Sequence, residues 1–288
     1  MKQIAFATSS QLPSLTDDDR LAIEWLQRQH VQVQPLVWDS RPQRARDYAG
    51  IVIRSCWDYH LKPQQFLDWL GQTEAQGVPL WNSARVAAWN LDKRYLQYLG
   101  ERGVAIPPTV WLEKDSKANL FDILGEQGWE NAVVKPTISA TAFQTWITSP
   151  AQTGSDQPKL EQMLTRSGVM VQRFVEEIQT CGEWSFVFFL KKYSHAVLKR
   201  TRSGDFRVQN EFGGYLDDIS PSASLIEQAQ RIVDLTDEQL LFARVDGIEI
   251  EGKFQLMELE LIEPLLFLGR DSRAPQRFSE AIVSVLEQ

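Results

Sequence analysis

Cysteine and histidine are scarce in this sequence of 288 residues, which holds two cysteines and three histidines. Cys56 and Cys181 form no CxxC pair, so neither a disulfide framework nor a structural zinc site is indicated. No apolar run approaches the roughly 20 residues that a helix needs to span a membrane. The start MKQIAFATSS also lacks the apolar core of a signal peptide. We therefore expect a soluble, cytoplasmic protein with no membrane partner.

Positive charge is in deficit as well, because the formal net charge is -8. This balance argues against a general nucleic-acid binder, although an acidic enzyme can still gather anionic substrates in a locally basic cleft. With 43% hydrophobic residues, the chain can bury a sizeable core. Its length predicts two or three lobes and leaves a homo-oligomer open.

The most informative stretch is residues 241–263, LFARVDGIEIEGKFQLMELELIE. It predicts two strands joined by a turn at Glu251, Gly252 and Lys253. Since strand side chains alternate between faces, one face should hold the apolar residues Val245, Met257, Leu259 and Leu261.

A turn of three residues then places Asp246 opposite Glu258 and Arg244 opposite Glu260. Like charges that face each other across a strand pair are destabilising, so these acids need a cation. A hard, oxygen-preferring ion such as Mg2+ or Mn2+ suits them, and the three acids should converge on one point. The alternative is an ordinary hairpin with a solvated polar face. Two observations argue against this alternative. The acids do not alternate with lysines, and the segment that follows, residues 264–268, is too apolar for an exposed edge.

The first ninety residues alternate short apolar runs, at residues 3–7, 31–37 and 50–54, with helical patterns. Such alternation predicts a small parallel α/β unit, in which ligands bind beyond the carboxyl ends of the strands. The third strand is followed there by a cation, a hydroxyl, an indole and an acid, a mixture suited to a small zwitterion. These four residues are Arg54, Ser55, Trp57 and Asp58. The alternative is an ordinary loop in which Asp58 caps a helix.

Two asparagines are expected to begin helices, Asn82 before residues 83–89 and Asn90 before residues 91–100. Lys93 then lies in a first helical turn, where a lysine opposes the helix dipole. It is either simply solvated or it meets an anion. Farther along, an apolar strand at residues 131–136 delivers Lys135, and the following loop is rich in hydroxyl groups but has no glycine.

The most basic stretch of this acidic protein contains Lys199, Arg200, Arg202 and Arg207. Clustered cations upstream of the clustered acids suit a phosphate and a metal ion that bind together.

Several motifs in this order resemble the ATP-grasp superfamily, in particular its glutathione synthetase and ribosomal-protein glutamate ligase branch. They are Lys93 after a cap, VVKP, VMVQRFVEE, GEWSFVF, GDFRVQNEFGG, RVDGI and LMELELIEP. The resemblance covers about residues 91–268. The segments RSCWDYH and ELELIEP further resemble the D-cycloserine-forming ATP-grasp ligases, which close a ring within one substrate molecule.

The resemblance implies an ATP-grasp fold of the α/β plus α+β class. Residues 1–90 would form a small parallel α/β domain and residues 91–288 the ATP-grasp domain. The latter would comprise a lid lobe at about residues 104–168 and a C-terminal lobe with an antiparallel sheet at about residues 169–288.

The resemblance also implies roles for individual residues. ATP phosphates would be held by Lys93 and Lys135. The adenine would lie against Gln172, Arg173, Phe174 and Val175, and the ribose against Glu183. The transferred phosphate would meet the catalytic residues Lys199, Arg207 and Arg244, with Gln209 standing where relatives commonly have asparagine. The metal ligands would be Asp246, Glu258 and Glu260, the last of which replaces the usual asparagine.

The implied activity is an ATP-dependent ligase that joins a carboxylate to an amine through an acyl-phosphate, between molecules or within one. Its substrate would be a small amino acid or peptide, and its cofactors ATP and Mg2+ or Mn2+. Two alternatives stay open at this point. One is a regulatory protein that binds a nucleotide without ligase activity, and the other is a different ATP-dependent phosphoryl transferase.

Overall fold

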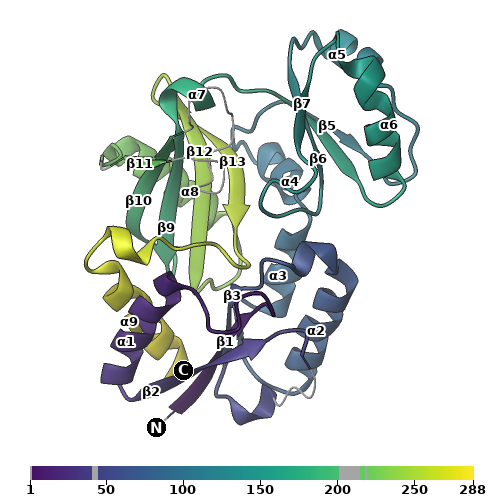
Figure 1. Ribbon diagram of the computed structural model, residues 1–288. Coiled ribbons are helices and arrows are strands. Elements are labelled where there is room, and N and C mark those ends of the chain that lie inside the picture. Colours follow the sequence, from purple (N-terminus) through teal and green to yellow (C-terminus); the bar gives the residue numbers. More distant parts are fainter. Residues whose placement is uncertain (1, 41–44, 201–214, 218) are drawn as a thin grey trace.

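The computed structural model describes residues 2–40, 45–200, 215–217 and 219–288 (Figure 1). Two predicted site residues, Arg207 and Gln209, lie outside these ranges. The described chain forms three sheets, with strand orders β2-β1-β3-β4, β5-β8-β6-β7 and β11-β10-β9-β12-β13. The first sheet is parallel and the other two are built from antiparallel pairs. This architecture confirms the predicted fold class. None of the described helices is long and apolar enough to cross a membrane.

The N-terminal sheet buries apolar side chains on both faces of its central strands β1 and β3. Alternate residues of the first strand point to opposite sides, with Ile4 and Phe6 in one apolar cluster and Ala5 and Ala7 in another. The chain here runs through β1 Lys2–Thr8, α1 Asp17–Arg28, β2 Val31–Val37, a 3-10 turn Ala45–Asp47, β3 Ile51–Ser55, a 3-10 turn Tyr59–Leu61, α2 Pro63–Ala75 and β4 Leu80–Trp81. The C-terminal helix α9, Ala274–Leu286, packs beside α1 (Figure 1).

The second sheet carries two helices that pack against each other. Its elements are β5 Thr109–Leu112, α5 Leu120–Gln127, β6 Ala132–Pro136, β7 Trp146–Thr148, α6 Thr153–Leu164 and β8 Val169–Arg173. Because β8 pairs with β5 and β6, this sheet extends to Arg173. The predicted end of the lid lobe at residue 168 is therefore too early. Helix α6 contains Pro158 in its interior.

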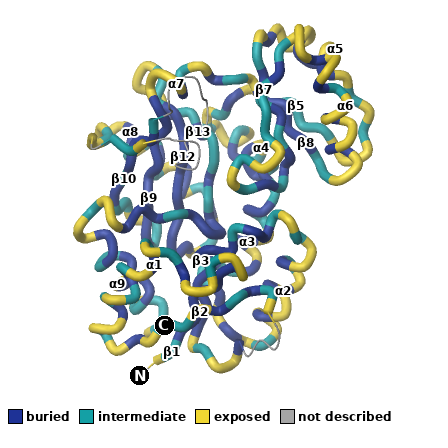
Figure 2. Tube along the Cα trace, in the orientation of Figure 1, coloured by how far each residue is buried: buried dark blue, intermediate teal, exposed yellow. Residues whose placement is uncertain are grey.

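The third sheet contains strand β9, which is buried along its whole length (Figure 2). Its elements are α7 Ile178–Cys181, β9 Glu183–Phe189, β10 Lys192–Arg200, β11 Tyr215–Asp217, α8 Ala223–Asp234, β12 Phe242–Ile250 and β13 Lys253–Glu260, followed by a 3-10 turn Leu268–Arg270. Helix α8 packs on one face of the sheet through Leu225, Ala229 and Val233.

The β12–β13 hairpin has the predicted pairs Arg244 with Glu260 and Asp246 with Glu258. The route to this register differs from the prediction. The turn has two residues, Glu251 and Gly252, both with positive φ, as a tight hairpin turn requires. A bulge between Asp246 and Gly247 then shifts the register by one residue. The shorter turn and the bulge shift the register in opposite directions, so the pairs beyond the bulge are the predicted ones.

The bulge also decides where Met257 points. We predicted Met257 on the same face as Leu259 and Leu261, and this is wrong. Leu256 joins those two leucines in the apolar core, whereas Met257 packs against a separate small cluster that contains Ile248. Simple alternation fails here because a bulge exchanges the faces of the residues on its two sides.

Asn82 and Asn90, predicted as helix caps, do not cap helices; their side chains bind the main chain of other segments. Helix α3, Ala84–Leu91, is capped by Ser83, and Asn90 lies within it; α4 follows at Tyr95–Glu101. The Asn82 amide group bonds the main chain of Leu241, Phe242 and Leu261 at 2.7–2.9 Å.

Asn90 makes a matching pair of bonds farther along the same edge. Its Nδ2 donates to the carbonyl of Leu259, and its Oδ1 accepts from the amide of Leu261, both at 2.8 Å. The hydroxyl of Tyr95 accepts from the Leu259 amide at 3.1 Å. Side chains of the α3–α4 segment thus take the place of a neighbouring strand at the edge of β13.

We predict that Asn90→Ala destabilises the fold by about 2–4 kcal/mol, because it leaves two buried main-chain groups without partners. Urea unfolding followed by circular dichroism measures the loss. Asn131→Ala is the matched control, since the Asn131 side chain makes no hydrogen bond with the described residues, and it should change stability by less than about 0.5 kcal/mol. Equal losses in the two variants would contradict the bridging role.

Candidate functional site

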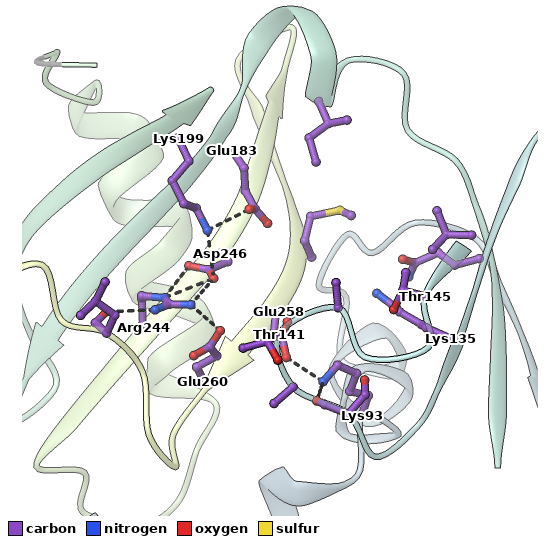
Figure 3. Close-up of a pocket in the computed structure, with 18 of the residues that line it drawn as sticks. Lys93, Lys135, Thr141, Thr145, Glu183, Lys199, Arg244, Asp246, Glu258 and Glu260 are labelled. Atoms are coloured by element: carbon purple, nitrogen blue, oxygen red, sulfur yellow. Dashed lines mark hydrogen bonds and ion pairs between the residues drawn. The ribbon is translucent and has the colours of Figure 1, made fainter. Parts of the chain in front are cut away.

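A cavity of about 440 Å³ lies where the second and third sheets face each other (Figure 3). Its size is typical of sites for small molecules. Most of the predicted site residues line it. They are Trp57, Lys93, Lys135, Gln172, Arg173, Phe174, Val175, Glu183, Lys199, Arg244, Asp246, Glu258 and Glu260.

Asp246 has the strongest set of partners in the cavity. Its carboxylate accepts from Ser185 Oγ at 2.6 Å and from Arg244 Nη2 at 2.9 Å, and lies 3.4 Å from Lys199 Nζ. Burial raises the pKa of this carboxyl, but Arg244 and then Lys199 outweigh it and hold the pKa at about 2. Asp246 is therefore ionised at neutral pH.

Glu258 and Glu260 meet different cations. The Glu258 carboxylate lies 2.8 Å from Lys93 Nζ, which also donates to the carbonyl of Ser139 at 2.6 Å. Lys93 is thus buried and paired, not solvated. Glu260 pairs with Arg244. Burial raises the pKa of Glu260 to about 7. Arg244 lowers this pKa, but the negative charges of Asp246 and Glu258 raise it together with burial.

The three acids share one cavity but do not meet at one point. Asp246 and Glu260 turn toward Arg244, whereas Glu258 turns toward Lys93 (Figure 3). Across the described chain, no group of three or more His, Cys, Asp or Glu side chains is arranged to hold a metal ion. The predicted convergence is not found in this arrangement, and the assignment of these acids as metal ligands stays a prediction. The carboxylate donors fit Mg2+ chemically, and they lie on the same side of the hairpin.

The remaining cations differ in how they are held. Lys199 Nζ lies 2.8 Å from the Glu183 carboxylate. For Lys135, no hydrogen bond or ion pair is found among the described residues. Burial lowers the pKa of Lys135 to about 8 against the opposing effect of Glu258, and Lys93 contributes a smaller part of this lowering. Lys135 is the cation in this cavity most in need of an anion.

The predicted adenine segment forms a mostly apolar end of the cavity. Gln172 Nε2 donates to Thr109 Oγ1 at 3.0 Å, and the Phe174 amide donates to the Asn131 carbonyl at 3.1 Å. Val175 packs with Ile178 and Ile248. The apolar wall also includes Val133, Leu216 and Met257. The bulge in the hairpin is what turns Met257 into this wall.

The predicted acceptor pocket is wrong for three of its four residues, because Arg54, Ser55 and Asp58 do not line the cavity. Arg54 is 2% exposed and its Nε lies 2.7 Å from Asp19 Oδ1. The Ser55 hydroxyl bonds Thr8, and Asp58 accepts from the Trp38 indole at 2.8 Å. Each of these three side chains thus has a partner inside the N-terminal domain. Only Trp57 reaches the cavity.

Sequence reasoning also missed several residues that line the cavity. They are Tyr59, Asn90, Ile178, Leu216, Met257, Glu263, Leu265 and Phe267. Glu263 stood in the quoted motif ELELIEP, so an unassigned acid next to the predicted ligands was the available signal.

Comparison with solved structures identifies the class of fold. The chain has the ATP-grasp fold, which confirms the resemblance predicted from the motifs. It superposes on a RimK domain ATP-grasp protein from Sphaerobacter thermophilus with a TM-score of 0.70 and 14% identity, over 98% of this chain and 99% of that one.

A more similar relative matches the second resemblance. The crystal structure of D-cycloserine synthetase DcsG superposes with a TM-score of 0.88 and 23% identity, over 99% of both chains. Residues 4–82 match the family model of the DcsG N-terminal domain. The cycloserine biosynthesis protein DcsG of Streptomyces lavendulae is 27% identical over 259 residues, which cover 83% of this chain and 84% of that protein.

We predict that Lys93 and Glu258 are energetically coupled. A double-mutant cycle with Lys93→Met and Glu258→Gln, followed by urea unfolding, should give a coupling energy of about 1–3 kcal/mol. The control cycle is the exposed pair Arg20 and Asp17, which should give a value near zero. Equal coupling energies in the two cycles would show that burial does not strengthen the interaction between Lys93 and Glu258.

The lowered pKa of Lys135 predicts a pH dependence. A phosphate needs the charged lysine, so affinity for ADP in EDTA should fall as pH rises through about 8, by up to about tenfold per pH unit. Calorimetric titration between pH 6.5 and 9.5 measures this. In Lys135→Arg the guanidinium keeps its charge, and the decline should disappear. The same decline in both proteins would remove Lys135 as its cause.

Proposed function

We propose that this protein is an ATP-dependent ligase that joins the carboxylate of a small amino acid or peptide to an amine and releases ADP and phosphate. The observation that carries this proposal is one cavity in which Lys93, Lys135 and Lys199 stand opposite the acids of the β12–β13 hairpin. The likeness to a cycloserine biosynthesis protein favours an amine within the same substrate molecule, so that a ring closes.

The reaction needs activation because a carboxylate is a poor electrophile. In the proposed first step, a carboxylate oxygen of the substrate attacks the terminal phosphorus of ATP, the bond from that phosphorus to its bridging oxygen breaks, and ADP leaves. The amine then attacks the carbonyl carbon of the acyl-phosphate, loses a proton and expels inorganic phosphate. Positioning and charge stabilisation account for most of such catalysis.

The cations of the cavity have distinct tasks in this scheme. Lys135, which has no partner among the described residues, would contact the ATP phosphates together with Lys93. Lys199 and Arg244 would stabilise charge on the transferred phosphoryl group, and Arg207, outside the described residues, stays a prediction for the same task. Asp246, Glu258 and Glu260 would hold Mg2+, which neutralises charge between the phosphates.

Water must be kept from the acyl-phosphate. We propose that the lobe of the second sheet, from about residue 104 to Arg173, acts as the lid, since its strand β6 and the loop after it bring Lys135 and Ser139 to the cavity. Closure of such a lobe excludes solvent and completes the site. The domain boundary near residue 90, the oligomeric state and the cytoplasmic location stay predictions.

The test is release of ADP and phosphate in the presence of ATP and Mg2+, screened against amino acids and dipeptides in both configurations. We expect at least one substrate to stimulate release and to yield an amide product by mass spectrometry. A stable phosphorylated product without amide would indicate a phosphoryl transferase instead. Raised thermal stability with ATP but no turnover would indicate a regulatory nucleotide-binding protein.

Two variants assign the activity to this cavity. Lys135→Ala and Glu258→Ala should each lower the rate by about a hundredfold or more, because each removes a charge that the transition state needs. Lys192→Ala and Glu249→Ala are matched controls, since both residues lie outside the cavity, and they should keep the wild-type rate. Normal substrate-dependent ADP release by either cavity variant would disprove the site.

A further inference from the structure

Among the residues that the structure describes, Glu263 is an acid of the cavity without a partner. It follows β13, is 8% exposed and lines the cavity. The other lining acids, Glu183, Asp246, Glu258 and Glu260, each form an ion pair. In the part of the chain that the structure describes, no hydrogen bond or ion pair reaches the Glu263 carboxylate. Because an unpaired buried carboxylate is costly, this position is suited to a cationic ligand group.

The chain around Glu263 is held firmly. Asn82 and Asn90 bind the main chain of Leu261, and the indole Nε1 of Trp57 donates to the main-chain carbonyl of Glu263 at 3.1 Å. A binding group on such a supported segment keeps its geometry when ligand enters. A carboxylate held in a fixed position can discriminate between ligands by the position of their cationic group.

The surroundings of Glu263 favour an organic ammonium over a metal ion. Two aromatic residues, Trp57 and Tyr59, line the same cavity. Aromatic rings attract ammonium groups through cation–π contacts, whereas Mg2+ prefers a shell of oxygen ligands. Burial and then Glu260 raise the pKa of the Glu263 carboxyl well above its usual range, against the effect of Lys93. A cation placed beside it would favour the ionised form.

The position of Arg244 orients the ligand. Arg244 Nη1 donates to the carbonyl of Leu265, two residues beyond Glu263, at 2.9 Å. A positive and a negative group of the protein therefore stand near each other at this end of the cavity. They match the carboxylate and the ammonium of one amino acid.

We propose that Glu263 binds the free ammonium group of the substrate, so that the cavity accepts an amino acid or peptide with a charged amine, its carboxylate directed toward Arg244. The inference rests on the proposed function and adds a specificity residue to it. N-acylated and deaminated analogues are then excluded, because they leave Glu263 buried without a partner.

The experiment measures binding separately from turnover. The probes are D- and L-alanine, D- and L-serine and their alanine dipeptides, each compared with its deaminated analogue, in the presence of Mg2+ and a non-hydrolysable ATP analogue. Calorimetry with the wild type should detect binding of at least one amino compound and no binding of its deaminated analogue. In Glu263→Gln, the affinity for that amino compound should fall by about thirtyfold or more, while nucleotide affinity stays unchanged.

Glu249→Gln is the matched control, because Glu249 lies on the same hairpin outside the cavity, and it should bind all probes like the wild type. The proposal is overturned if no amino probe binds the wild type or if deaminated analogues bind equally well. It is also overturned if Glu263→Gln keeps the affinity, or if it alters only the Mg2+ requirement. A preserved circular dichroism spectrum and nucleotide affinity verify that the variant folds.

Failure of the proposed function gives a different result. If an amino probe binds in a manner that depends on Glu263 but the wild type forms neither ADP nor amide with it, the ligase proposal fails and the assignment of Glu263 stands. If ADP and amide form with an amino substrate and Glu263→Gln keeps the wild-type KM, the ligase proposal stands and the assignment fails.

Discussion

The crowding of Asp246, Glu258 and Glu260 on two paired strands is the constraint on which the rest of this structure depends. Carboxylates this close are unfavourable unless cations intervene. The fold supplies them from separate elements: Arg244 from β12, Lys199 from β10, and Lys93 from the turn between α3 and α4. The ion pairs of the hairpin acids therefore connect parts of the chain that are far apart in sequence. An anionic ligand that binds these cations would compete with the same ion pairs.

The hairpin can carry this charge because its edge is fixed. The side chains of Asn82, Asn90 and Tyr95 bond the main chain of β13 and its continuation where another strand would otherwise pair. These bonds determine the course of the segment that contains Glu260 and Glu263. Preorganisation of this kind is what a site for charge stabilisation requires. It also explains why helix α3, remote in sequence from the β12–β13 hairpin, contributes Asn90 to the cavity.

The sequence allowed the fold class to be predicted. It also allowed the pairing of Asp246 with Glu258 to be predicted, but only because the bulge and a turn shorter than the expected one shift the register in opposite directions and cancel. It did not reveal the bulge beside Gly247, which places Met257 in the cavity wall. Nor did it reveal that Asp19 pairs with Arg54. Local patterns show which residue types lie near one strand end. They do not show which of those groups are already paired by a distant helix, and this is why Arg54 and Asp58 looked like ligand-binding residues.

The charge balance of the cavity limits what can bind there. Among the described residues that line it, the cations equal the carboxylates in number; they are Lys93, Lys135, Arg173, Lys199 and Arg244 against Glu183, Asp246, Glu258, Glu260 and Glu263. A bare triphosphate would add negative charge to this space. In the proposed function, divalent cations that enter with the nucleotide would offset this charge near the hairpin, and a substrate ammonium would pair with Glu263. A carboxylate at Glu260 is tolerated beside Asp246 because both carboxylates pair with Arg244.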